Sequence, residues 1–339
     1  MSDPQEVSHA APTRRATTLT PVSAALAVMC CLFWAGAYVT GKLAIGTPDA
    51  PGFGPFRAAF FRFAIAGAVL GAWGLCRNRA SLRVQKRDWP AFGRVALLGM
   101  GLTYVFNYQG LALSTGTAAA LIMATEPVWI AVLAVLFLRE RVTPPRLFGI
   151  VAGLTGAMLV VLSTQKSGAS PSAGASAMLG NVLMVLSLLW ESGAVLTAKK
   201  LTARYKGRTI LTYEFLLGAL LLAPFAIWET IQTGSLHPTR AAWWSFGYLV
   251  TACTLVAYVV WFWLLETTDA SELTVFIFLQ PVVGTLMGVA LFGDPFTLVT
   301  LSGAILVLAG LAGLTWQTKG RPTPADSPLD NPVPEAFAP

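Results

Sequence analysis

Ten long apolar runs divide this sequence and constrain its fold more than any other feature. A helix needs roughly 20 apolar residues to cross the hydrocarbon core of a bilayer, and most of the runs approach or exceed that length. In total 55% of the residues are hydrophobic and 12% are charged, whereas soluble domains carry about twice that share of charge. The runs occupy residues 21–45, 54–76, 91–113, 115–138, 147–163, 178–198, 208–229, 241–265, 271–292 and 298–316. Because helices satisfy their own backbone polar groups in lipid, we predict an all-α integral membrane protein with ten transmembrane helices.

The second half of the chain repeats the first half. Residues 138–144 recur in looser form as residues 291–297, and at one constant spacing Pro127 aligns with Pro281 and Thr143 with Thr297. The spacing from Pro127 to Pro281 is called the repeat offset below. Each half then contains five spans, and because five is odd the second half enters the membrane upside down. We therefore predict two inverted five-helix repeats, with a substrate site near the bilayer midplane between them and alternating access as the halves rock.

The expected organisation has five parts. Residues 1–19 are polar and form a disordered cytoplasmic N-terminus. The first repeat covers residues 20–163, a connector rich in Ser, Gly and Ala covers residues 164–177, and the second repeat covers residues 178–317. Residues 318–339 are rich in proline, cannot bury a core and form a disordered cytoplasmic C-terminus.

The basic residues predict the orientation of the chain in the membrane. If the N-terminus lies inside, most of the 23 Lys and Arg residues fall on the cytoplasmic side, as the positive-inside rule requires. The exceptions are Lys42, Arg57, Arg62, Lys166 and Arg240. We therefore expect a multi-pass protein of the cell (inner) membrane with both termini cytoplasmic. This distribution also accounts for the net charge of +7 without a nucleic-acid partner, so the expected partners are the lipid bilayer and a small-molecule substrate.

Cysteine and histidine give no sign of a metal site, a cofactor or a catalytic centre. The cysteines show neither CxxC nor metal-ligand spacing, and they are Cys30, Cys31, Cys76 and Cys253. His9 and His237 lie outside the apolar runs. A membrane-embedded enzyme would need a nucleophile and base, or a metal, in converging positions, and the spans contain no such pattern. We expect no catalytic residues, metal or cofactor.

Two prolines lie near the middle of the fourth and ninth spans. Pro127 and Pro281 each remove a backbone hydrogen bond and should kink their helices, either for packing or so that the freed carbonyls line a cavity. Glu126 precedes the first proline, and Gln280 precedes the second. A carboxylate near the midplane costs about 2.5–3.5 kcal/mol. Glu126 is therefore expected either to bond a neighbouring group or to face a watery cavity, as a proton carrier or a partner for a substrate ammonium.

Other unusual side chains also lie within the spans. Trp34 and Trp190 are too deep to be interfacial anchors, and each either fills the core or forms a flat wall for a substrate side chain. Glu191 is a second acid at mid-span. Arg62 has three possible roles: it snorkels outward, it pairs with Glu126 or Glu191, or it binds a substrate carboxylate.

The third span carries a polar, aromatic face. Tyr104, Asn107 and Tyr108 are three and four residues apart and share one side of a helix, and Tyr258 corresponds to Tyr104 in the second repeat. Such a face points into the protein, where it makes interhelical hydrogen bonds, forms a ligand wall, or does both. Glu214, in the seventh span, lies closer to the cytoplasmic surface, within reach of basic residues there.

These residues predict a central cavity bounded by the first, third, fourth, sixth, eighth and ninth spans, with Pro127 and Pro281 facing each other across it. The candidate substrate-binding residues are Trp34, Arg62, Tyr104, Asn107, Tyr108, Glu126, Trp190, Glu191, Tyr258 and Gln280. If transport is coupled to protons, a buried carboxylate must also change its protonation state.

The motifs in both halves resemble the repeat of EamA-type transporters. In the first half the resemblance is carried by Trp34, Phe61-Arg62-Phe63, Pro127, the segment 138–143 and Gly149; in the second half by Trp190, Gln280-Pro281-Val282, Gly293-Asp294 and Gly303. The second copy departs from the pattern at Asp294, where glutamate is usual, and at Pro295. The membrane portion resembles the drug/metabolite transporter superfamily, EamA type. That resemblance implies a secondary carrier, commonly an exporter of amino acids or other small metabolites.

The leading hypothesis from the sequence is therefore secondary transport that exports amino acids or related small metabolites by alternating access. The alternatives within transport are a multidrug carrier or a cofactor carrier of the same fold. The alternatives outside transport are a non-transporting membrane scaffold and a membrane-embedded enzyme.

Overall fold

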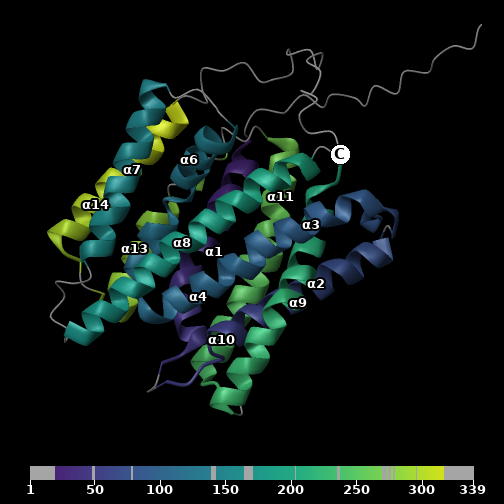
Figure 1. The fold of residues 1–339 in the computed structure, drawn as a ribbon, viewed down its shortest axis with the longest axis horizontal. Helices are drawn as coiled ribbons and strands as arrows, with labels where there is room; N and C mark the ends of the chain where they lie inside the picture. Colours follow the sequence, from purple (N-terminus) through teal and green to yellow (C-terminus); the bar gives the residue numbers. More distant parts are fainter. Residues whose placement is uncertain are drawn as a thin grey trace, which may run out of the picture.

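A computed structural model describes residues 20–47, 50–77, 79–138, 143–163, 171–202, 204–234, 237–268, 273, 276–277, 279–294 and 296–316. These residues form helices joined by short loops (Figure 1). The two termini expected to be disordered, and residues 139–142 of the repeated segment, lie outside the described residues.

The first repeat contains five spans, two of which are interrupted. The first two spans are α1 (Pro21–Ile45) and α2 (Pro55–Arg77), followed by the short 3-10 turns Arg79–Leu82 and Lys86–Asp88. The third span consists of α3 (Trp89–Ala96), the π-helical turn η3 (Leu97–Leu102) and α4 (Thr103–Leu113). The fourth span is divided into α5 (Gly116–Met123) and α6 (Glu126–Leu138), and the fifth is α7 (Pro144–Ser163).

The second repeat follows the same plan. Its first two spans are α8 (Pro171–Thr202) and α9 (Gly207–Thr233). The next consists of α10 (Arg240–Tyr248), the π-helical turn η5 (Leu249–Val256) and α11 (Ala257–Thr267). The chain ends its membrane portion with α13 (Leu279–Phe292) and α14 (Leu298–Trp316). Helix α8 begins at Pro171, inside the segment 164–177 that was expected to connect the repeats.

Threonine side chains set the starts of several helices. The Oγ1 atom of Thr20 accepts a hydrogen bond from the backbone N of Ser23 at 3.1 Å, and Thr115 accepts one from Ala118 at 3.1 Å. These bonds satisfy backbone donors that the first turn of a helix leaves free. Pro21, at the first position of α1, has no such donor and fits there without loss.

The described helices have the apolar character of membrane spans. Seven stretches are long and apolar enough to cross a bilayer, and residues 279–291 and 298–314 form two shorter apolar helices. Large apolar side chains also cover the outer surface, among them Leu220, Ile227, Leu286 and Ile305, as expected where a surface faces lipid rather than water. Together with the ten spans traced above, this confirms the predicted all-α membrane fold.

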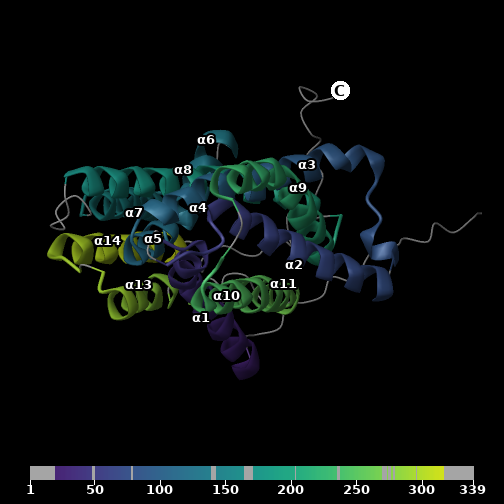
Figure 2. The same cartoon turned by 90° about the horizontal axis from the view of Figure 1, so that it is seen from below.

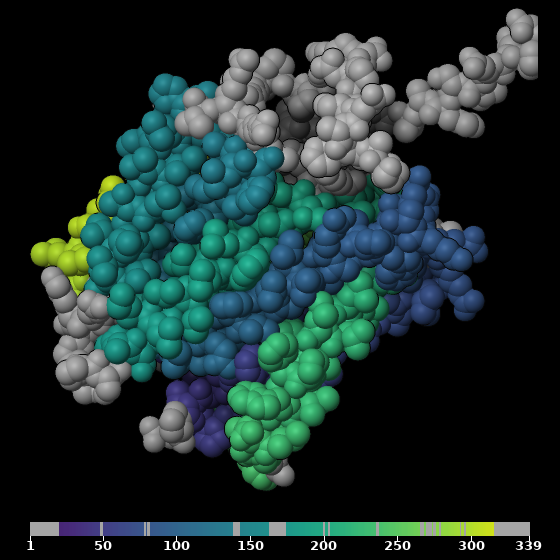
Figure 3. Space-filling view, viewed as in Figure 1, coloured from purple at the N-terminus to yellow at the C-terminus, as the bar shows by residue number. Residues whose placement is uncertain are grey.

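The two repeats interlock, and their main packing contacts occur in related pairs. Helix α7 packs against α14, and α2 packs against α9, and each pair forms one end of the molecule (Figures 1 and 2). Helix α8 contacts α4 and α6, as α1 contacts α11 and α13. On the face shown in Figure 3, α3 and α4 of the first repeat run between α8 and α9 of the second.

Glycines explain the close packing of α7 against α14. A Cβ at Gly149 would lie 2.8 Å from the carbonyl oxygen of Gly310, and a Cβ at Gly156 would lie 2.7 Å from that of Gly303. Small residues allow helix backbones to approach in this way. By the repeat offset, Gly149 is equivalent to Gly303, and Gly156 is equivalent to Gly310. Replacing each glycine by its equivalent therefore turns one contact into the other. The contacts therefore obey the pseudo-twofold relation between the repeats.

Both repeats also contain a π-helical turn. These turns were not among the features expected from the sequence. η3 and η5 overlap when the second repeat is shifted back by the repeat offset. At the end of η3 and within η5, a threonine hydroxyl donates to the carbonyl five residues earlier: Thr103 to Leu98 and Thr254 to Leu249, both at 2.7 Å. π-helical turns often occur at functional sites. Here η3 contributes Gly99 and Met100 to the lining of the central cavity, and Thr254 of η5 bonds Arg62, which also lines it.

Candidate functional site

A cavity of about 1020 Å³ lies between the two repeats. The six spans predicted to bound it all contribute, through α1, η3 with α4, α5 with α6, α8, α11 and Gln280 of α13. The four remaining spans also line it, through Arg62 of α2, Arg146 of α7, Glu214 of α9 and Leu314 of α14. The cavity is large enough for an amino acid or a drug-sized ligand.

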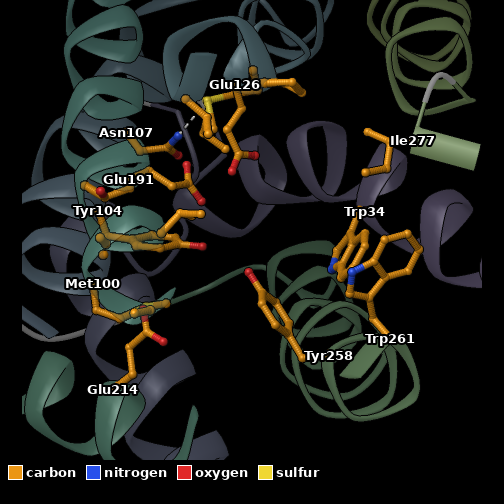
Figure 4. Close-up of a pocket in the computed structure, with 18 of the residues that line it drawn as sticks. Trp34, Met100, Tyr104, Asn107, Glu126, Glu191, Glu214, Tyr258, Trp261 and Ile277 are labelled. Carbon is orange, nitrogen blue, oxygen red and sulfur yellow. Dashed lines mark hydrogen bonds between the residues drawn. The ribbon is translucent and has the colours of Figure 1, made fainter. Parts of the chain in front are cut away.

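The cavity has two chemically different walls (Figure 4). Glu126, Glu191 and Glu214 come from α6, α8 and α9 and lie along one side. Trp34 of α1 and Trp261 of α11 stand on the opposite side. One wall is therefore acidic and the other aromatic.

Arg62 is buried beside the cavity and is held by neutral groups. Its side chain does not snorkel outward, since only 5% of the residue is exposed. Its Nε donates to Oγ1 of Thr254 at 2.7 Å, and its Nη1 donates to the hydroxyl of Tyr108 at 3.0 Å. The guanidinium carbon also lies 5.2 Å from the ring centroid of Phe63 and 5.8 Å from that of Tyr104, within the range of cation–π attraction.

The pairing considered for Arg62 does not occur. Neither Glu126 nor Glu191 forms an ion pair with it among the described residues. Tyr108 and Thr254 take that place, which a sequence could not reveal because Thr254 comes from the other repeat, 192 residues away.

The acidic wall contains a buried oxygen atom without a partner. The Oε2 atom of Glu191 is buried and makes no hydrogen bond in the described part of the chain. Glu214 also faces the cavity, although basic residues at the surface seemed able to neutralise it. Gly99, in the π-helical turn η3, makes room for its carboxylate, since a Cβ there would lie 2.5 Å from Oε1 of Glu214.

The polar face of the third span both binds neighbouring helices and lines the cavity. Asn107 donates through Nδ2 to the sulfur of Met123 at 3.2 Å and to Oγ of Ser187 at 3.5 Å. Tyr104 and Tyr108 line the cavity beside it. Both alternatives considered for this face, interhelical bonding and a ligand wall, are therefore present together.

Trp34 lines the cavity, but Trp190 does not. The indole Nε1 of Trp34 donates to the carbonyl oxygen of Cys253 at 3.0 Å, and its ring meets those of Tyr258 and Trp261 edge-on, with centroids 5.4 and 5.2 Å away. Trp190 is absent from the lining and packs near Phe106, with ring centroids 6.3 Å apart.

The expectation that Trp190 forms a substrate wall is therefore corrected. The spacing from Trp34 to Trp190 exceeds the repeat offset by two positions, so the two tryptophans are not equivalent in the repeats. Two extra residues turn a side chain by about 200° around a helix. At the repeat offset, Ala37 corresponds to Glu191, and both of these line the cavity.

The mid-span prolines also differ from expectation. The fourth span is broken at Ala124 and Thr125 rather than kinked. Pro127 occupies the first turn of α6, where a backbone N–H would have no acceptor within the helix. Pro127 lines the cavity, as Gln280 does, but Pro281 is buried elsewhere. The prediction that the prolines face each other is wrong, because successive residues of a helix point about 100° apart and Gln280 takes the inward direction.

Polar contacts join helix ends next to Leu111, which lines the cavity. Oδ2 of Asp294, which follows α13, accepts a hydrogen bond from the backbone N of Thr117 at 2.8 Å. Nearby, the hydroxyl of Ser114 bonds Asn181 of α8, and the ammonium of Lys42 donates to the Ser114 carbonyl. The predicted site contained none of these residues. The cavity also reaches the end of α8 and the start of α9.

Two ion pairs, called the charged clamps below, join the repeats away from the cavity. Nε of Arg57 lies 3.5 Å from Oε2 of Glu229, which also accepts the backbone N–H of Arg57 at 2.8 Å. At the opposite end of the α2–α9 pair, Asp88 accepts hydrogen bonds from Arg204 at 3.0 Å and from the Tyr205 hydroxyl at 2.7 Å. Among the described residues, no group of three or more His, Cys, Asp or Glu side chains is placed to hold a metal ion.

A known protein family matches each of the two repeats separately. The profile of the EamA-like transporter family matches residues 22–162 and again residues 178–316. The chain is 28% identical over 282 residues to an uncharacterized transporter of Archaeoglobus fulgidus, a match that covers 83% of this chain and 92% of that protein. It is 25% identical over 307 residues to a probable terminal-alkyne amino-acid exporter of Streptantibioticus cattleyicolor, covering 89% of this chain and 96% of the exporter.

A solved crystal structure shares the same fold. Its TM-score is 0.60 at 20% sequence identity, and the superposition covers 89% of this chain and 99% of that one.

Proposed function

Because this chain belongs to the EamA-like transporter family, we propose that it exports amino acids or related small metabolites across the cell (inner) membrane by alternating access. The family consists of membrane transporters, so the chain is a transporter and not an enzyme. The observation that carries the finer proposal is the cavity between the repeats. In the proposal, the hydrogen bond between Asp294 and Thr117 closes one end of that cavity. The similarity to a probable amino-acid exporter supports the choice of substrate.

In this proposal the cavity is the substrate site, and the two repeats rock around it. The charged clamps Arg57–Glu229 and Asp88–Arg204 hold α2 and α9 and their loops together. The contact between Asp294 and Thr117 must break when the closed end opens. An inverted repeat suits this motion, because exchanging the conformations of its two halves converts one orientation of the site into the other.

The proposed coupling ion is the proton. Glu126, Glu191 and Glu214 face the cavity together, and burial of like charges disfavours ionising all of them at once. A carboxylate that binds a proton on one side of the membrane and releases it on the other would drive export. In the proposed orientation both termini are cytoplasmic.

Counterflow in proteoliposomes tests the transport proposal. Purified protein is reconstituted with one unlabelled compound inside the vesicles, and uptake of the same radiolabelled compound is measured across a panel of amino acids, their decarboxylated amines, cofactors and drugs. We expect saturable exchange of at least one amino acid or amine, absent from protein-free vesicles. Exchange of only cofactors or bulky drugs would favour the alternative carrier functions, and exchange of nothing would refute transport of this class.

A further inference from the structure

The charges that line the cavity do not balance. Three carboxylates face it, from Glu126, Glu191 and Glu214, against two guanidinium groups, from Arg62 and Arg146. Arg146 donates through Nη2 to the carbonyl oxygen of Ala131 at 3.2 Å. The hydrogen bonds of Arg62 to Thr254 and Tyr108, and the aromatic rings beside it, already hold its charge in place. The acidic wall of the cavity is therefore better suited to bind a cationic ligand than an anionic one.

The three carboxylates are not engaged in hydrogen bonds or ion pairs with the described part of the protein. None of the three accepts a hydrogen bond or joins an ion pair among the described residues, and the buried Oε2 atom of Glu191 is unpartnered. By contrast Glu229, which lies outside the cavity, is bound by Arg57. A buried ionised group without a partner is costly, so a ligand that supplies a cationic donor gains from meeting it.

The opposite wall suits an apolar or aromatic group. Trp34 and Trp261 meet edge-on with Tyr258 beside them, and the indole N–H of Trp34 is already bonded to Cys253. The rings of Trp34 and Trp261 therefore offer mainly apolar surface and π-faces, and π-faces also attract cations.

We propose that the substrate binds in this cavity as an amine-bearing organic cation, with its ammonium group on the acidic wall and its apolar or aromatic part on the tryptophan wall. Glu191 is the central ligand, and Glu126 and Glu214 flank it. This inference rests on the proposed transport function, because it names the chemical class of the cargo. Within amino acids and related metabolites, it selects compounds whose amine charge is not cancelled by a carboxylate.

Binding of matched probes tests the inference directly. Detergent-purified protein is titrated at neutral pH with 2-phenylethylamine, L-phenylalanine and 3-phenylpropionate, and with tryptamine, L-tryptophan and indole-3-propionate. Within each set the ring is constant and the charge goes from positive through zwitterionic to negative. We expect at least one amine to bind roughly tenfold or more tightly than its acid, since a charge-assisted hydrogen bond contributes about 1.5–3 kcal/mol. An acid that binds as tightly as its amine, or no binding by either amine, would overturn the inference.

Variants locate the binding site. Glu191→Gln should weaken amine binding by about tenfold or more, for the same energetic reason. Glu229→Gln is the matched control, because it makes the same chemical change outside the cavity and should leave the affinity unchanged. If Glu191→Gln does not yield a monodisperse protein, Glu214→Gln replaces it. Gly99→Ala adds a methyl group against the Glu214 carboxylate and should also weaken amine binding, although it removes no charge. Unchanged amine affinity in all the cavity variants would refute the assignment.

Binding and flux separate the two proposals. Amine binding without exchange in proteoliposomes would support the ligand class and contradict transport. Exchange of amino acids by a protein that binds no amine would support transport and refute the cationic class.

Discussion

Arg62 of the first repeat donates a hydrogen bond of 2.7 Å through Nε to the hydroxyl oxygen of Thr254 in the second repeat. Thr254 in turn donates to the Leu249 carbonyl within the π-helical turn η5. The buried guanidinium is thus tied to an irregular turn of the opposite repeat, beside the cavity.

This bond predicts a loss of stability when the acceptor is removed. Thr254→Val keeps the shape of the side chain but leaves a buried N–H of Arg62 unpaired, which should destabilise the fold by about 1–3 kcal/mol. The measurement is the thermal unfolding midpoint in detergent. Thr254→Ser retains the hydroxyl and should stay close to the wild type, and equal midpoints for the Val and Ser variants would contradict the role of the bond.

Substitutions of Trp34 and Trp190 should affect transport differently. Trp34→Leu removes part of the aromatic wall and should raise the KM for substrate counterflow several-fold. Trp190→Leu changes a side chain outside the cavity and should leave KM unchanged, while lowering the unfolding midpoint. A larger KM effect at Trp190 than at Trp34 would show that the cavity lining is assigned to the wrong residues.

Proton coupling predicts a specific defect in the acidic wall. Glu126→Gln should abolish flux driven by a pH gradient while leaving expression and folding largely intact, since an amide cannot exchange a proton. The test compares gradient-driven uptake in proteoliposomes for wild type, Glu126→Gln and Glu191→Gln. Glu229→Gln, outside the cavity, serves as control. If both cavity variants kept normal pH-dependent flux, these carboxylates would not carry the proton.

The contact between Asp294 and Thr117 predicts a gate. Asp294→Ala removes the acceptor of the 2.8 Å bond to the backbone of Thr117 and should favour opening of the closed end. A single cysteine at Ala37, which lines the cavity, should then react faster with an impermeant thiol reagent applied to intact cells. The comparison is made in a background without native cysteines. An unchanged labelling rate would exclude this contact as a barrier.

The orientation predicts which surface loops react from outside the cell. Cysteines at Arg83 and Lys206, both exposed on loops, should resist an impermeant thiol reagent in intact cells and react after permeabilisation. The exposed native Cys76 must first be replaced. A cysteine at Lys166, outside the described residues, should react without permeabilisation. Labelling of the Arg83 position in intact cells would reverse the topology.

The sequence alone was sufficient for the spans and the repeat. A bilayer requires long apolar helices, so their number and approximate limits can be read from hydropathy, and the repeat offset relates Gly149 to Gly303 without any coordinates. It also identified Glu126 and Glu191 as interior residues, because a carboxylate in a span must avoid lipid.

Tertiary structure decided which interior residues meet. The bond from Arg62 to Thr254 joins the two repeats, and hydropathy carries no information about which helices become neighbours. The rotation of each helix about its axis decided that Trp34 and Gln280 line the cavity while Trp190 and Pro281 do not, because a shift of one or two residues turns a side chain by about 100–200°. Local composition is thus enough to place a helix in the membrane, but only packing selects the face that it turns toward the substrate.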